Sequence, residues 1–200
     1  MDPNAIVNRL VRLARIDTSV FDEVRDDQQE LIPALIVLVV SSFLAGLGGA
    51  LYWTVVPMTF FELDAVWVNN FLLGSIFFAV MYVVAALVIY VVLAQMFKVT
   101  ADVQSLLRTM GYASLPFAIC VLMFIPVVWP LFALAPLAIL LVSMIYAVQA
   151  ATNAESNQVV IATVIGFAVM VLVLGVIALQ HSAGDAPIGA GTFGILLDVS

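Results

Sequence analysis

Few side chains in this sequence could carry out covalent or metal chemistry. Cys120 is the only cysteine and His181 is the only histidine, so an intramolecular disulfide and a cysteine-based metal cluster are both excluded. Catalytic zinc sites take three protein ligands, commonly histidines, which one histidine cannot supply. The apolar neighbours of Cys120 predict a buried and unreactive thiol.

The carboxylates do not form the arrangement of a catalytic or metal site either. Glu62 and Asp64 lie near Asn69 and Asn70, but without the fixed spacing of oxygen ligands that a cation site requires. Acid–base catalysis needs a positioned pair of titratable groups, and no histidine, lysine or arginine lies beside these acids. The HExxH, GxSxG, Walker A and GxGxxG patterns are absent from the sequence. We therefore predict a protein that is not an enzyme and holds neither a cofactor nor a metal.

Composition indicates a membrane protein. Of 200 residues, 65% are hydrophobic and 10% are charged. In soluble domains, roughly 45–50% of residues are apolar and about 25% are charged. The mean hydropathy is +1.22. The net charge of −7, with one lysine among the six basic residues, also fits a halophilic source. Nucleic acid is not a predicted partner.

The gaps between charges locate the spans, because charges are costly at the bilayer centre. Uncharged runs cover residues 31–61, 65–97, 109–154 and 156–184. The third run would cover roughly 70 Å as a helix, about twice the hydrocarbon core, so it holds two spans. We predict an all-α, polytopic fold with five transmembrane helices at 31–53, 71–97, 111–128, 131–151 and 159–179, and a hairpin turn near 128–131.

The basic residues orient the chain. All six lie on the side of the N-terminus, in residues 1–30, the 98–110 loop and the 152–158 loop. Positive residues are retained in the cytoplasm. The prediction is a plasma-membrane protein with its N-terminus inside and its C-terminus outside.

The N-terminal segment reads as a short amphipathic helix. Arg9, Arg12 and Arg15 share one helical face over residues 5–16, and apolar side chains share the other. Such a helix lies in the headgroup plane, where the arginines contact anionic lipid. The alternative is that the apolar face packs on the cytoplasmic end of the bundle.

The chain divides into three predicted parts. Residues 1–30 form the amphipathic helix and an acidic linker, 31–180 the five-helix domain, and 181–200 a flexible, glycine-rich tail outside the cell. We favour a solvated linker over a docking surface for a basic partner at residues 17–30. Within the first span, Ser42, Gly46 and Ala50 recur at spacing four and predict a close helix-packing seam, more plausibly within the chain than between copies.

Two segments resemble a known family. Phe21-Asp22-Glu23-Val24 precedes the first span, and the stretch 103–116, ending Gly111-Tyr112-Ala113-Ser114-Leu115-Pro116, leads into the third. This pattern, over roughly residues 17–180, resembles the Yip domain family of Ypt/Rab-interacting membrane proteins, in a prokaryotic-type member. The resemblance implies a five-span fold. At Gly111, Tyr112 and Pro116 it implies tight helix packing, an interfacial ring and a kink.

The resemblance also implies a role in membrane organisation without catalysis. The Asp-Leu-Tyr-Gly-Pro motif linked to Rab binding is absent here, so Rab binding is not inferred. We expect a scaffold or partner-binding protein whose partners are membrane lipids and other membrane proteins or copies of itself. The alternative is a passive transporter, channel or lipid-translocating protein. That alternative is favoured by the proline-broken hairpin and the mild polar residues of the spans.

Overall fold

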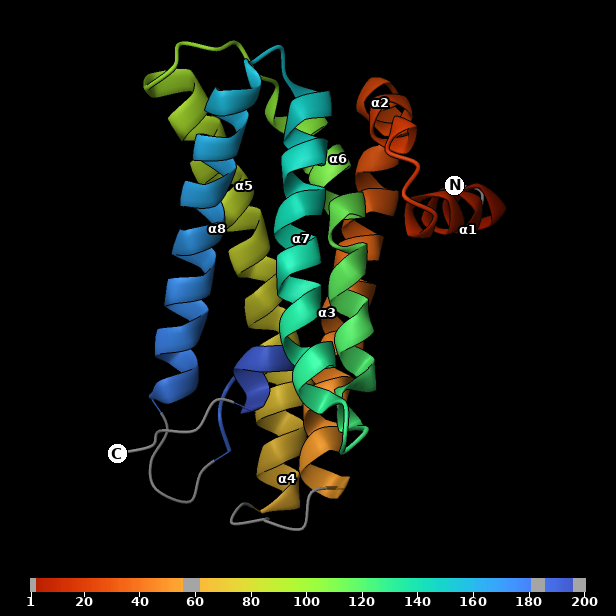
Figure 1. The fold of residues 1–200 in the computed structure, drawn as a ribbon, viewed down its shortest axis with the longest axis vertical. Helices are drawn as coiled ribbons and strands as arrows, with labels where there is room; N and C mark the ends of the chain where they lie inside the picture. Colours follow the sequence, from red (N-terminus) through yellow and green to blue (C-terminus); the bar gives the residue numbers. More distant parts are fainter. Residues whose placement is uncertain (1–2, 56–61, 181–185, 196–200) are drawn as a thin grey trace.

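The chain folds into a bundle of long apolar helices (Figure 1). A computed structural model describes residues 3–55, 62–180 and 186–195. In chain order the elements are α1 (Pro3–Ala14), α2 (Ser19–Asp26), the 3₁₀ turn η1 (Gln28–Glu30), α3 (Leu31–Val55), α4 (Leu63–Val66), the π-helix η2 (Trp67–Gly74), α5 (Ser75–Gln95), α6 (Val103–Ala113), the 3₁₀ helix η3 (Leu115–Phe124), α7 (Trp129–Ala151), α8 (Ser156–Leu179) and the 3₁₀ helix η4 (Gly191–Ile195).

Five of these segments are long and apolar enough to cross a membrane, namely Gln28–Val55, Leu63–Gln95, Val103–Phe124, Trp129–Ala151 and Ser156–Leu179. This confirms an all-α protein with five spans and a short N-terminal helix. The third segment starts eight residues before the predicted position 111. It includes α6, whose apolar face is buried although Arg108 lies within it.

The hairpin between the third and fourth spans lies at residues 125–128, slightly before the predicted turn. The reason is the position of the prolines. Pro130 occupies the first turn of α7, where backbone N–H groups have no partner within the helix. The missing N–H of proline therefore costs no hydrogen bond there. Pro136 lies inside α7, so only Pro126 remains for the turn itself.

The helix α3 packs centrally, against α5, α6, η2 and η3. Glycines on α3 bring backbones together, because a Cβ built on Gly48 would overlap the Cys120 carbonyl oxygen. Ser42, Gly46 and Ala50 are all buried, and Gly46 lies against Ser75 and the Asn70 carbonyl of the second span. These contacts lie within the chain.

Residues 186–195, the C-terminal hook, pack into the end of the bundle away from α2 (Figure 1). The Trp53 indole donates to the Gly194 carbonyl at 2.8 Å, Asn69 donates to Ala186 at 2.7 Å, and Asn70 donates to Pro187 at 3.1 Å. The expectation of a flexible tail is therefore wrong for this segment, because asparagine amides and glycine contacts hold its backbone. The remaining tail residues, 181–185 and 196–200, lie outside the described residues.

Trp53→Phe is expected to loosen the C-terminal hook. The substitution keeps most of the ring but leaves the buried Gly194 carbonyl without the indole donor, at a cost of about 1 kcal/mol. Limited proteolysis in detergent should then cleave residues 186–195 severalfold faster. Trp67→Phe, at a ring that is 37% exposed, is the matched control. Equal cleavage rates for both variants would contradict the role given to the indole.

Candidate functional site at the N-terminal end of the bundle

The helix α1 lies crosswise beside the bundle (Figure 1). Its end is a Schellman motif, in which the Asp17 N–H donates to Arg12 and the Ile16 N–H donates to Leu13. Glycine normally occupies the left-handed position of this motif, but here it is Ile16, with φ of 64°. A β-branched residue is strained there, and its side chain is 85% exposed.

Glu30 fixes α1 to the bundle. One carboxylate oxygen accepts an ion-paired hydrogen bond from Arg9 of α1, and the other accepts from the Tyr112 hydroxyl of α6 at 2.7 Å. Glu30 is 8% exposed and the Tyr112 ring is fully buried. The side chain of Tyr112 thus lies inside the bundle end, and its position at the depth of the inner membrane interface stays a prediction.

Arg9 and Arg12 of α1 and Arg15, which follows it, have different surroundings. Arg9 is bound to Glu30, and Arg12 pairs with Asp17 at 2.8 Å and with Glu23 at 2.7 Å. Arg15 is exposed and makes no ion pair with a described residue. Lipid contact by these arginines remains a prediction, and Arg15 is the one with its guanidinium uncommitted within the described residues.

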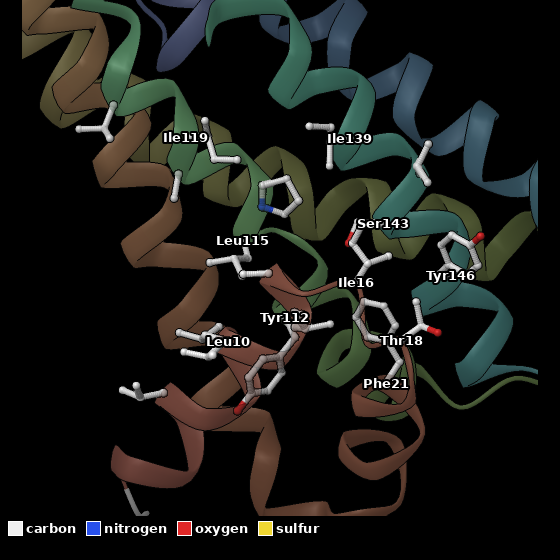
Figure 2. A pocket seen from close by; sticks show the side chains of 18 of the residues that line it. Leu10, Ile16, Thr18, Phe21, Tyr112, Leu115, Ile119, Ile139, Ser143 and Tyr146 are labelled. Carbon is white, nitrogen blue, oxygen red and sulfur yellow. The ribbon is translucent and has the colours of Figure 1, made fainter.

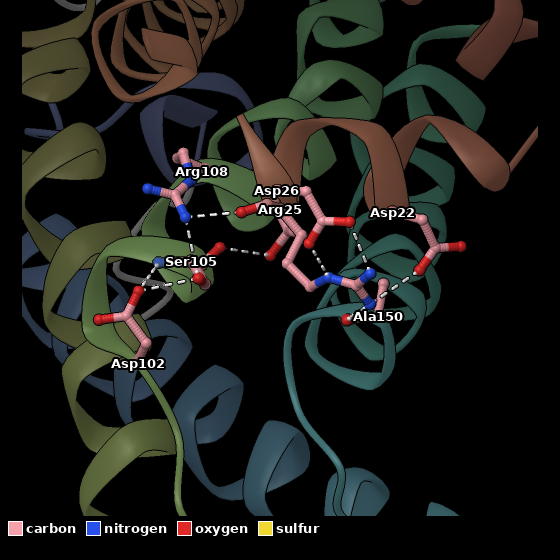
Figure 3. A network of polar contacts seen from close by, with 8 residues as sticks. Asp22, Arg25, Asp26, Asp102, Ser105, Arg108 and Ala150 are labelled. Carbon is pink, nitrogen blue, oxygen red and sulfur yellow. Dashed lines mark hydrogen bonds and ion pairs between the residues drawn. The ribbon is translucent and has the colours of Figure 1, made fainter. Parts of the chain in front are cut away.

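The helix α2 is seated on α6 and α7 rather than solvated. Its Val20, Phe21 and Val24 side chains are buried. Arg25 forms ion pairs with Asp26 and Asp22 on its own helix. It also donates a hydrogen bond to the Ala150 carbonyl of α7 at 3.0 Å (Figure 3). Our preference for a solvated linker is therefore wrong for residues 19–26, because an apolar face was hidden among the acids.

Arg108 of α6 links this helix to α2 through a hydrogen bond. Its guanidinium donates to the Arg25 carbonyl at 2.6 Å and to the Ser105 hydroxyl at 2.9 Å, and the residue is only 4% exposed (Figure 3). Asp102 caps α6 by accepting from the Ser105 N–H at 2.8 Å. The bundle end thus carries the buried charges Glu30 and Arg108 near the starts of two spans.

Three carboxylates here have lowered pKa values. Hydrogen bonds from Ser19 and Arg12 lower the pKa of Asp17, the Arg25 guanidinium lowers that of Asp26, and Ser105 lowers that of Asp102. Because folding lowers these pKa values, the stabilisation is complete above the ordinary carboxyl pKa, about 3.9. It is lost as pH falls through the lowered values.

Docking of α2 is therefore expected to be constant from pH 7 down to about 4 and to weaken only below that. Hydrogen exchange at residues 19–26 in nanodiscs measures it. Asp26→Asn should flatten part of the acid response, because the neutral amide no longer titrates. Weakening of α2 between pH 5 and 7 would contradict the assignment.

An apolar groove of about 860 Å³ runs beneath α1. We call it the α1 groove. Figure 2 shows Leu10 and Ile16 of the N-terminal segment, Leu115 and Ile119 of η3, and Ile139 of α7 around it. The hydroxyl-bearing residues Thr18, Ser143 and Tyr146 also line it.

The positions of the family motif converge on this end. A Cβ on Gly111 would lie 2.6 Å from the Ala34 carbonyl oxygen, so α6 and α3 cross in backbone contact. Pro116 starts η3, where the helix changes from α to 3₁₀ geometry, and lines the α1 groove. The motif residues thus occupy one helix crossing and one groove wall.

The residues considered first for chemistry do not assemble. Cys120 is buried in η3, and His181 lies outside the described residues. Among the residues that the structure describes, no group of three histidine, cysteine or acidic side chains could hold a metal. Sequence reasoning missed Glu30, Arg108 and Ile16. For Glu30 and Arg108, the available signal was a charged residue directly before the uncharged run of the first and of the third span.

Five apolar spans with the basic side chains gathered at one bundle end define an integral membrane protein. The chain belongs to the Yip1 domain family, whose family model matches residues 15–179. This confirms the resemblance seen in the two sequence segments. Neither a curated protein nor a solved structure matches the chain.

Proposed function

We propose that the protein is a non-enzymatic, membrane-organising scaffold of the Yip type, with its N-terminus in the cytoplasm. The observation that carries the proposal is α1, an amphipathic helix held crosswise to the spans by the Arg9–Glu30–Tyr112 bonds. A helix of this kind inserts its apolar face into one leaflet, about 5–10 Å deep. The protein thereby takes up area in the cytoplasmic leaflet, and the five spans anchor it there.

Charge supports the same orientation. The six basic residues all lie in residues 9–25 or 98–108, at the bundle end where α1 lies. Retention of positive residues in the cytoplasm then places α1 on the cytoplasmic leaflet. The carboxylates of α2 that remain half exposed, such as Asp22 and Glu23, give the scaffold an acidic surface above the membrane for a basic partner protein or a second copy.

The position of α1 is tested with two adjacent labels. Val7 lies on the apolar face, and Asn8 lies on the face of Arg12 and Arg15. Val7→Cys and Asn8→Cys, each labelled with an environment-sensitive fluorophore, leave the buried Cys120 unreacted. Brominated acyl chains should quench the label at position 7 strongly and that at position 8 weakly. Equal quenching would contradict insertion of the apolar face.

Scaffolding is tested by energy transfer between labelled copies in vesicles of defined lipid. We expect transfer above the value for random mixing, and no release of entrapped dye. Flux of solute or lipid above that of empty vesicles, together with random mixing of the copies, would favour the transporter alternative and overturn the scaffold.

A further inference from the structure

We propose that the α1 groove binds one anionic phospholipid, with an acyl chain along η3 and α7 and the phosphate at Arg15. The proposal rests on the proposed function only in placing α1 at the membrane surface. The groove opens beside helices that cross the membrane.

The length of the groove fits one leaflet. Its wall on the third span runs from Tyr112 to Leu122. One α-helical step and a 3₁₀ rise over the rest give roughly 20 Å, compared with about 15 Å for half of the hydrocarbon core. An extended acyl chain entering beneath α1 would therefore reach at least to the bilayer midplane, part of the way along the third span, which continues to the hairpin at 125–128.

The lining changes from polar to apolar along the groove, as a phospholipid changes from its headgroup and ester groups to its acyl chain. Apolar side chains such as Ile119, Leu122 and Ile139 form the deep part. The residues Thr18 and Tyr146 lie together near Ile16 at the α2 end (Figure 2). Hydroxyl groups there can donate to ester oxygens, which a hydrocarbon chain alone would not supply.

Charge complementarity selects an anionic headgroup. Arg9 and Arg12 are committed to carboxylates, but Arg15 is exposed and makes no ion pair with a described residue. It stands between Ala14 and Ile16, both of which line the groove. A guanidinium at that position can hold a phosphate with two parallel hydrogen bonds.

Ile16 supplies an independent argument. Its left-handed backbone is strained, and its side chain is 85% exposed, so the folded chain gains little from isoleucine at this position. The same side chain lines the mouth of the groove. An acyl chain in the groove would provide the contacts that the protein alone does not.

The test uses the full chain in vesicles that contain phosphatidylglycerol with a diazirine in its acyl chain. We expect labelled peptides from η3 and α7, and several-fold weaker labelling by the matching phosphatidylcholine probe. Arg15→Gln should remove that headgroup preference, about fivefold for one arginine. Equal labelling of the groove and of the exposed face of α8 would overturn the proposal, and so would the lack of a headgroup preference.

Two variants separate lipid binding from folding. Ile119→Trp should fill the groove and reduce labelling about tenfold, whereas Leu172→Trp, on the exposed face of α8, should not. Ile16→Gly should raise thermal stability in detergent while reducing labelling, a combination that misfolding cannot produce. Unchanged labelling in Ile119→Trp overturns the proposal. A polypeptide cross-linked into the groove in native membranes would instead identify a protein as the occupant.

The proposals of a lipid site and of a scaffold can be refuted independently of each other. Energy transfer between copies can be measured on the same vesicles as the labelling. Loss of labelling with clustering intact refutes the lipid site alone. Random mixing of the copies with labelling intact refutes the scaffold alone.

Discussion

Gly111→Ala is expected to destabilise the bundle by about 1–3 kcal/mol, the usual cost of overpacking a close contact. The added methyl would lie 2.6 Å from the Ala34 carbonyl oxygen and 2.7 Å from its carbon. Both are backbone atoms of α3, which cannot move aside as a side chain could. The helices α3 and α6 would have to separate where Glu30 and Tyr112 meet.

The measurement is the midpoint of unfolding in mixed micelles with rising SDS. Gly175→Ala is the matched control, because a Cβ at that position of α8 meets nothing within 4 Å. It should be neutral or slightly stabilising, since alanine has the higher helix propensity. Equal midpoints for the two variants would show that the α3–α6 crossing is not as close as described.

Glu30→Gln is expected to release α1 and to cost about 2–3 kcal/mol. The amide keeps the size of the side chain but loses the charge, and its NH₂ group faces a donor from either Arg9 or Tyr112. One of those donors is then left without an acceptor in a site where Glu30 is 8% exposed. Faster proteolysis within residues 3–14, together with a lower unfolding midpoint, is the expected readout.

Glu23→Gln serves as the control for the loss of a carboxylate. Glu23 pairs with Arg12 at a side chain that is 45% exposed, and exposed ion pairs contribute about 0–1 kcal/mol. Tyr112→Phe should fall between the two variants, because it removes one neutral donor and leaves the Arg9 pair. A Glu30→Gln variant as stable as Glu23→Gln would refute the role of Glu30 in joining Arg9 to Tyr112.

The five spans could be predicted from the sequence because the cost of charge in hydrocarbon acts on each segment separately. Runs free of charge at 31–61 and 156–184 locate the first and last spans to within a few residues. The buried Glu30 and Arg108 could not be found in this way. Glu30 meets Tyr112 across 82 positions of sequence, and only the tertiary fold brings such partners together.

Local patterns also misled at α2 and the C-terminal hook. The acids around Phe21 suggested a solvated segment, but three apolar side chains on one face decide where α2 packs. The glycines after 183 suggested flexibility. In the fold, Gly189 and Gly194 allow close approach to Phe193 and to the Asn70 amide, and a pattern within one segment does not indicate what that segment will touch.

The C-terminal hook gives the bundle an order of assembly. Synthesis runs from the N-terminus, so α3 and η2 enter the membrane long before residues 186–195 exist. Until α8 has been inserted, Asn69 and Asn70 have no carbonyls of the hook to donate to, and Trp53 lacks its Gly194 acceptor. Closure of that end by the hook therefore follows the synthesis of all five spans.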